Sequence, residues 1–195
     1  MNNPYFDKRQ EFFKSYFELA QTYEEYLKTA EPAHRARWDT FKSKITINSE
    51  QKAVLKSFIR ELNILVMSGT WCGDCARQGP MFAQLEAINP KLRFRFIDNK
   101  QNPDLQNELR INGAEKVPVV VVLSEDYYEI ARFGDRHLSV YRRKLISELG
   151  AACDPGIIPP SGEELSTEVT EWVNFLERAH ALLRLAPLLR RRYND

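Results

Sequence analysis

Two cysteines, Cys72 and Cys75, are separated by two residues and directly follow an apolar run at residues 62–67. That run has the length and β-branching of a buried strand, and the residues after Cys75 have a helical pattern. Cys-x-x-Cys between a strand and a helix indicates thiol–disulfide exchange rather than metal binding. Unpaired N–H groups at a helix N-terminus favour a thiolate, which is the attacking species. We therefore expect Cys72 to be the nucleophile and Cys75, one helical turn on, to be the resolving cysteine.

Three neighbours of these cysteines are expected to support them. Gly73 is expected to let the backbone turn tightly beside the reactive sulfur, and Trp71 to cover the site and offer a flat surface to a partner chain. The carboxylate of Asp74 suits a helix N-terminus but repels the thiolate of Cys72. Near a surface this repulsion is about 1 kcal/mol, or roughly 20 mV in a two-electron potential. By itself it raises the pKa of Cys72 and makes the pair more reducing.

The alternative interpretation of the Cys-x-x-Cys pair is that it forms half of a zinc site. Zinc needs about four ligands. The only further cysteine is Cys153, and the three histidines are scattered without ligand spacing: His34, His137 and His180. We therefore expect no metal. Cys153 is expected to be an ordinary free cysteine, with a role as a second resolving thiol as the alternative.

Composition narrows the function classes and the compartment. The chain has 195 residues, a net charge of +1 and only three cysteines. The near-neutral charge gives no reason to expect nucleic acid or an acidic membrane as a partner. Few cysteines suit a reducing compartment, and residues 1–8 lack the apolar core of a signal peptide. No apolar stretch approaches the ~18 residues of a membrane span, so we expect a cytoplasmic protein.

Hydrophobic periodicity and turn residues predict the remaining elements. We expect a strand–helix–strand unit around the cysteines, whose crossover makes its two strands parallel, followed by an antiparallel hairpin and a helix. This is an α/β fold with a small mixed sheet of about four strands and helices on both faces. The expected helices are 5–29, a second one starting at Pro32, 49–60, the motif helix to Asn89, 102–109, 135–149 and one from 165 onward. The expected strands are 62–67, 93–97, 118–123 and 128–133.

The motif Trp71-Cys72-Gly73-Asp74-Cys75 follows an apolar strand and precedes, by roughly forty residues, Val117-Pro118 and a valine-rich strand. In this order the chain resembles the thioredoxin superfamily over residues 46–150. The resemblance implies a thioredoxin-like fold with helical additions. The chain then divides into an N-terminal helical extension (1–45), a thioredoxin-like domain (46–150), a linker (151–164) and a C-terminal helix (165–195).

The resemblance also implies a substrate-binding set opposite the cysteines. The Val117–Pro118 bond is expected to be cis, and the backbone of Val117 to pair with an extended substrate segment; a trans proline at a strand start is the alternative. Gly134, which ends the last strand, completes the set.

Two positions depart from the thioredoxin pattern. Asp74 replaces a proline, and Val66 replaces a buried aspartate that helps to deprotonate the resolving cysteine, so either Asp74 substitutes through water or resolution is slow.

The leading functional hypothesis is a thiol–disulfide oxidoreductase that reduces protein disulfides. No cofactor is expected, because the Cys72–Cys75 disulfide would be returned to the dithiol by an external disulfide reductase. One alternative is a binding module whose helical extensions dock a partner. Another is a glutathione-linked, glutaredoxin-like enzyme with Arg77, Lys116 and Arg132 as sources of positive charge. The sequence makes no prediction of oligomeric state.

Overall fold

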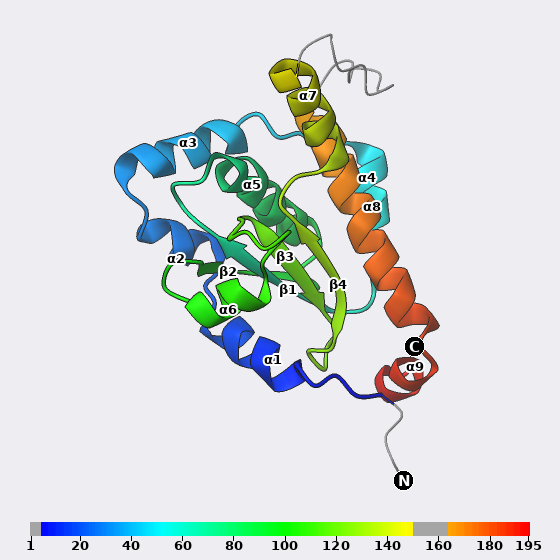
Figure 1. Cartoon of the computed structure of the whole chain (residues 1–195). Helices are drawn as coiled ribbons and strands as arrows, with labels where there is room; N and C mark the ends of the chain where they lie inside the picture. The colour runs from blue at the N-terminus through cyan, green and yellow to red at the C-terminus, as the bar shows by residue number, and fades with distance from the viewer. Residues whose placement is uncertain (1–4, 150–163) are drawn as a thin grey trace.

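The computed structural model describes residues 5–149 and 164–195 (Figure 1). Its centre is a four-stranded sheet with the strand order β2-β1-β3-β4. The strands are β1 (Leu62–Ser68), β2 (Leu92–Asp98), β3 (Val119–Leu123) and β4 (Glu129–Gly134). β1 pairs in parallel with β2 and antiparallel with β3, which itself pairs antiparallel with β4. The predicted mixed sheet of four strands is therefore confirmed.

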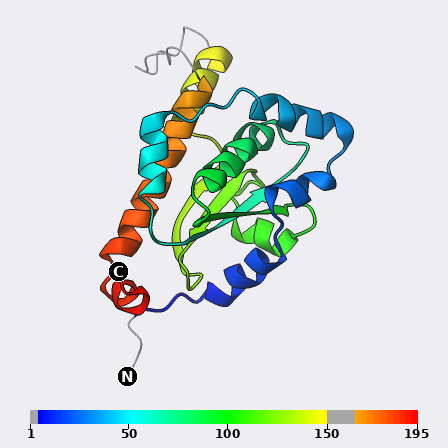
Figure 2. The same ribbon diagram turned by 180° about the vertical axis from the view of Figure 1, so that it is seen from behind.

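The two faces of the sheet are covered by different helices. On one face Phe82, from α5 (Gly73–Ile88), stacks on Phe94 of β2, with their ring centroids 4.9 Å apart. The same phenylalanine meets Trp172 of α8 (Glu164–Leu185) edge-on. Figure 2 shows α4 (Ser49–Lys56) lying along α8 on this side.

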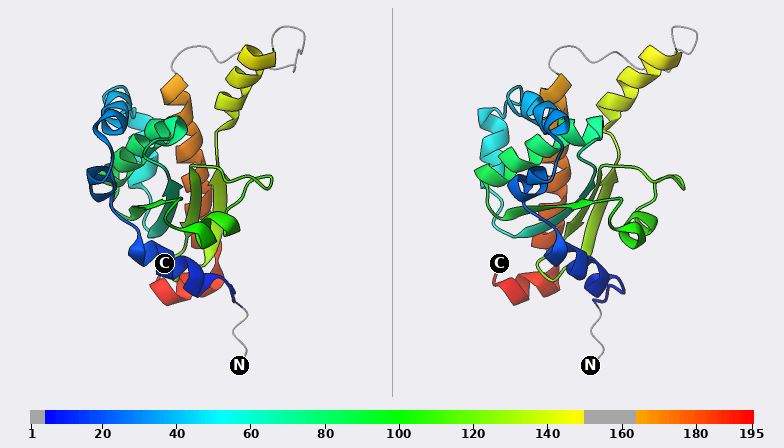
Figure 3. Two further views of the ribbon diagram at one scale, coloured as in Figure 1. Left: turned by 60° about the vertical axis from the view of Figure 1, so that its left-hand side comes forward. Right: turned by 90° about the vertical axis from the view of Figure 1, so that its left-hand side faces the viewer.

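The other face is covered by α1 (Gln10–Leu19) and α6 (Pro103–Glu108). Successive side chains of a strand point to opposite faces, so Arg93 lies away from Phe94. The guanidinium of Arg93 lies over the ring of Phe17 in α1, 5.4 Å from its centroid. Figure 3 shows α6 and α5 on opposite sides of the sheet. Helices therefore cover both faces, as predicted.

The prediction of one long helix over residues 5–29 is wrong, because the structure has α1 and a separate α2 (Tyr23–Lys28). Between them the backbone of Gln21 exchanges two hydrogen bonds with Phe96 at the edge of the sheet, of 2.8 and 2.7 Å. These groups are then unavailable to a helix. Thr22 caps the new helix in a capping box with Glu25, a spacing that the sequence displays.

Two other N-terminal starts agree with prediction. α3 (Pro32–Lys42) has Pro32 in its first turn, and α4 begins after Asn48, whose side chain accepts from the N–H of Gln51. α4 ends at Lys56, four residues earlier than predicted. Both starts depend on local cap chemistry, which is why sequence alone located them.

The C-terminal part differs more from prediction. α7 (Leu138–Leu149) begins three residues later than expected. The predicted single C-terminal helix is two, α8 and α9 (Pro187–Tyr193), because Pro187 has no N–H with which to continue α8. The predicted linker lies outside the described residues except for Glu164, which begins α8, and Cys153 also lies outside them.

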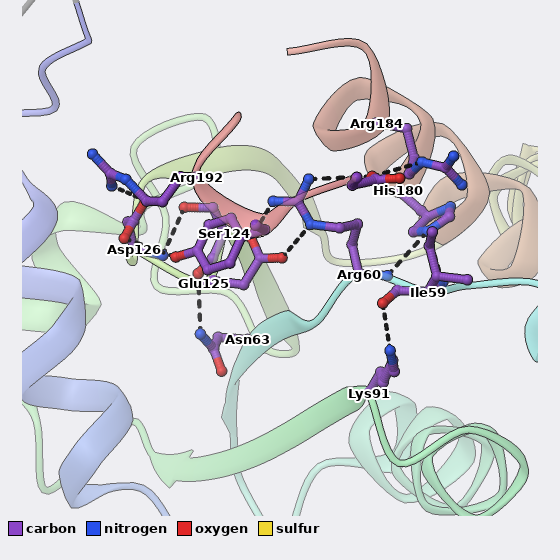
Figure 4. A network of polar contacts seen from close by, with 12 residues as sticks. Ile59, Arg60, Asn63, Lys91, Ser124, Glu125, Asp126, His180, Arg184 and Arg192 are labelled. Carbon is purple, nitrogen blue, oxygen red and sulfur yellow. Dashed lines mark hydrogen bonds and ion pairs between the residues drawn. The ribbon is translucent and has the colours of Figure 1, made fainter. Parts of the chain in front are cut away.

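The C-terminal helices are fixed to the end of the sheet where β1 begins, opposite the end that carries the cysteines (Figure 4). Arg60, just before β1, pairs with Glu125 at 2.6 Å and with Asp195 at 3.4 Å. Nε2 of His180 in α8 accepts the N–H of Ile59 at 3.1 Å. α8 and α9 are therefore part of the folded core. Among the described residues, no helix combines the length and apolarity needed to cross a membrane.

Candidate active site

The two cysteines lie where β1 passes into α5. Cys72 is the N-cap residue of the helix, with extended backbone angles (φ −77°, ψ 128°), and its carbonyl accepts from the N–H of Ala76 at 2.9 Å. Cys75 follows in the first turn. Cys72 is 9% exposed and Cys75 1% exposed, and both are free thiols. The junction therefore leaves one cysteine slightly exposed and holds the other fully beneath it.

The surroundings give these thiols different acidities. A hydrogen bond from the Cys75 thiol lowers the pKa of Cys72 to about 7, and the backbone N–H groups of Cys75 and Asp74 add to this effect. Burial and the charge of Asp74 oppose it. Burial raises the pKa of Cys75 well above its ordinary value. At neutral pH Cys72 is therefore the sulfur that carries the charge.

The loop before β3 faces Cys72. The Val117–Pro118 peptide bond is cis, as predicted. The thiol of Cys72 donates to the carbonyl oxygen of Val117, with a sulfur–oxygen distance of 3.6 Å. The structure thus brings the expected proline loop and the expected nucleophile together.

The two glycines of the predicted site lie in different surroundings. A Cβ on Gly134 would lie 2.9 Å from the carbonyl oxygen of Pro118 and 2.8 Å from Cδ1 of Ile111. Gly134 therefore lets β4 approach the proline loop closely. A Cβ on Gly73 would meet nothing within 4 Å, and Gly73 begins a regular helix. The backbone at Gly73 does not itself require glycine, and the absent side chain leaves open space beside Cys72.

Asp74 belongs to a chain of charges that joins three segments around the site. Its carboxylate pairs with Arg136 at 2.7 Å, and Arg136 also pairs with Asp135 at 3.2 Å. Asp135 in turn holds Lys116 at 3.1 Å and accepts from the hydroxyl of Tyr141. These contacts tie the start of α5 to the loop before Pro118 and to the segment after β4. Sequence reasoning missed Arg136, because no spacing relates it to the cysteines.

A helix of the N-terminal extension supports the turn before Cys72. Nε1 of Trp38 in α3 donates to the carbonyl of Thr70 at 2.9 Å, and Arg37 donates to the carbonyl of Trp71 at 3.3 Å. The ring of Trp71 is 42% exposed, with the ammonium of Lys100 5.1 Å from its centroid. Trp38 is thus both a fully buried core residue and a support of the active-site turn.

The residues considered for metal binding and for glutathione binding do not form such sites among the described residues. In the part of the chain that the structure describes, no three His, Cys, Asp or Glu side chains are grouped to hold a metal. The three cations considered for glutathione binding each hold a carboxylate of the chain: Arg77 holds Glu168, Lys116 holds Asp135 and Arg132 holds Glu129.

Comparison with known proteins identifies the family. The family model for thioredoxin matches residues 20–142. The chain belongs to the thioredoxin family. It is 34% identical over 62 residues to Thioredoxin C-3 of Corynebacterium nephridii, a match that covers 32% of this chain and 40% of that protein. It is 28% identical over 64 residues to a putative thioredoxin 2 of Streptomyces coelicolor, covering 33% and 46%. Each match therefore spans less than half of the relative's length.

A solved structure shares the fold over a longer part of the chain. The crystal structure of a protein of unknown function from Pseudomonas aeruginosa superposes with a TM-score of 0.68 at 18% identity. The superposition covers 86% of this chain and 98% of that one. The common fold therefore extends beyond the sheet to flanking helices.

Proposed function

We propose that this protein is a thiol–disulfide oxidoreductase that reduces protein disulfides. The observation that carries the proposal is the difference in acidity between Cys72 and Cys75, placed beside a cis-proline loop. A sulfur that ionises near neutral pH suits attack, and a buried sulfur one turn away suits resolution. A reducing compartment such as the cytoplasm would keep the pair ready to act.

The reaction has two exchange steps. The Cys72 thiolate attacks one sulfur of the substrate disulfide, forming a mixed disulfide and releasing the other sulfur as a thiolate. Cys75, after losing its proton, attacks Sγ of Cys72; the Cys72–Cys75 bond forms and the remaining substrate sulfur leaves as a thiolate. The dithiol thus supplies two electrons, and an external disulfide reductase returns them.

Substrate binding would use the space and the backbone around Cys72. In this structure the Cys72 thiol donates a hydrogen bond to the carbonyl oxygen of Val117. Ionisation of Cys72 removes that donor and frees the carbonyl for an N–H of an extended substrate segment. The missing side chain at Gly73 leaves room for the segment, and the exposed ring of Trp71 offers it an apolar surface.

The test compares the wild type with Cys72→Ser and Cys75→Ser on a two-chain protein disulfide such as insulin. We expect Cys72→Ser to be inactive and Cys75→Ser to stop after one exchange, retaining a covalent mixed disulfide through Cys72. Turnover at the wild-type rate by Cys72→Ser would refute the proposal.

The structure gives less support to the two alternatives. Phe13, Phe17, Tyr26 and Trp38 of the N-terminal extension are buried in the core, so this aromatic face is not free to dock a partner. The cations considered for glutathione are paired with carboxylates. Partner binding that is unchanged in Cys72→Ser would favour a binding module, and rapid reduction of a glutathione mixed disulfide would favour a glutaredoxin-like enzyme.

A further inference from the structure

Two buried hydroxyl groups lie beneath the active site without a hydrogen-bond partner. Ser68, the last residue of β1, is fully buried, and Tyr26 of α2 is 2% exposed. Neither the Ser68 Oγ nor the Tyr26 Oη atom makes a hydrogen bond of normal distance and angle. Buried hydroxyls are nearly always bonded, so two such groups close together require an explanation.

These hydroxyls are neighbours of the resolving cysteine. Burial raises the pKa of both Cys75 and Tyr26, and the Ser68 hydroxyl between them lowers both. The charges of Cys72 and of Asp98, at the end of β2, also raise the pKa of Tyr26. None of these groups carries a positive charge that would help Cys75 to ionise. The proton of Cys75 must therefore be transferred to another group before Cys75 can attack.

Tyr26 also borders a pocket between the N-terminal extension and the end of β2. The pocket has a volume of about 590 Å³, and its lining is mainly polar. Because a water molecule occupies about 30 Å³ in the liquid, the pocket is large enough to hold many waters. Tyr26, His34, Thr70, Trp71 and Asp98 are among the residues that line it. Tyr26 therefore lies between the buried surroundings of Cys75 and a pocket large enough for water.

We propose that Ser68 and Tyr26 form a path that carries the Cys75 proton to water in this pocket while the mixed disulfide is resolved. The inference rests on the proposed oxidoreductase function. Ser68 Oγ accepts the proton from Cys75 Sγ and passes its own proton to Tyr26 Oη. Tyr26 releases its proton to water. The Cys75 thiolate attacks Sγ of Cys72, and the substrate sulfur leaves as a thiolate with the electron pair of the broken bond.

The two residues differ in how directly they act. In the proposed path Ser68 exchanges a proton directly with the reacting thiol, and it is a catalytic residue in that sense. Tyr26 acts through Ser68 and is a positioning residue. Because burial holds the pKa of Tyr26 above its ordinary value, the phenol passes a proton on without storing a charge. The path also gives α2 a chemical role, because this helix of the N-terminal extension supplies Tyr26, which borders the pocket.

Stopped-flow kinetics with a peptide disulfide that carries a different dye on each half separates the two exchange steps. Attack by Cys72 releases the first half, and resolution by Cys75 releases the second. We expect Ser68→Ala and Tyr26→Phe to attack at the wild-type rate. Both variants should resolve roughly tenfold or more slowly at neutral pH, because a positioned proton acceptor contributes at least that factor. The pH midpoint of resolution should also rise.

Two controls separate the proton path from a structural effect. Ser68→Thr retains a hydroxyl and should restore much of the resolution rate. Tyr23→Phe removes a second buried, unpartnered hydroxyl of α2, but the charged groups that act on Tyr23 are Asp39, Glu24 and Arg35. We expect Tyr23→Phe to resolve at the wild-type rate.

The possible failures are distinguishable. Normal attack with unchanged resolution and pH profile in both Ser68→Ala and Tyr26→Phe would overturn the proton path alone. Equal slowing by Tyr23→Phe and Tyr26→Phe would also overturn it, since the effect would then be one of packing. Failure of the wild type to attack at all would overturn the proposed function together with the path.

Discussion

Removing the positive charge of Arg136 should raise the pKa of Cys72. Arg136 lies 2.7 Å from the carboxylate of Asp74, whose charge raises that pKa. Both side chains are about a quarter exposed, at 23% and 24%, so solvent screens them only partly. One charge acting on a thiolate in such a place contributes about 1 kcal/mol, which equals about 0.7 of a pKa unit. Arg136→Gln should therefore raise the Cys72 pKa by roughly this amount, from its value of about 7.

The opposite change should follow from Asp74→Asn, which removes the repulsive charge and leaves the positive charge of Arg136 without this partner. The double variant Arg136→Gln/Asp74→Asn should return the pKa of Cys72 close to that of the wild type, because both charges are then absent. The two-electron potential should shift by at most about 20 mV in each single variant, more reducing in Arg136→Gln and more oxidising in Asp74→Asn.

The assay is the pH dependence of alkylation by iodoacetamide, followed by mass spectrometry of the peptide that contains Cys72. Cys75 is buried and of high pKa, so its labelling is slow and is resolved separately. Arg132→Gln is the matched control, since Arg132 also holds two carboxylates, Glu108 and Glu129. An unchanged or lowered Cys72 pKa in Arg136→Gln would refute the reasoning that Arg136 offsets Asp74.

Three further predictions concern packing and stability. Gly79→Ala should lower the free energy of unfolding by about 2 kcal/mol, because its Cβ would lie 2.0 Å from Cζ3 of Trp38. Gly73→Ala should leave the free energy of unfolding nearly unchanged, because its Cβ would meet nothing within 4 Å. Thermal unfolding of both variants tests this difference. Burial lowers the pKa of His137 from 6.5 to about 3, so the stability conferred by the neutral ring should be lost as the pH falls from 6.5 to about 3. Denaturant unfolding of His137→Phe should therefore show a free energy of unfolding that depends less on pH than that of the wild type. An equal pH dependence in the two proteins would contradict this. Glu168→Gln should lower the free energy of unfolding by about 2 kcal/mol in the same assay, because the fully buried carboxylate binds two arginines. An unchanged free energy of unfolding would mean that the arginines find other partners.

Elements governed by neighbouring residues were predicted well. The apolar run of β1, the cap at Asn48 and the proline at the start of α3 all act within a few residues of the chain. The break between α1 and α2 was missed because it depends on the pairing of Gln21 with Phe96, which lies far away in sequence. The capping signal at Thr22 was present, but helical periodicity on both sides outweighed it.

The sequence by itself determined the chemistry at the end of β1. Two cysteines at this spacing, on a strand–helix junction, predict a nucleophile and a second thiol because helix geometry and the N-terminal N–H groups are local properties. Only the tertiary structure decided what surrounds them. Arg136 beside Asp74, Trp38 beneath Thr70, and the hydroxyls near Cys75 come from segments that folding brings together. Side-chain acidity depends on burial and on charges across space, and neither is encoded in the spacing of residues along the chain.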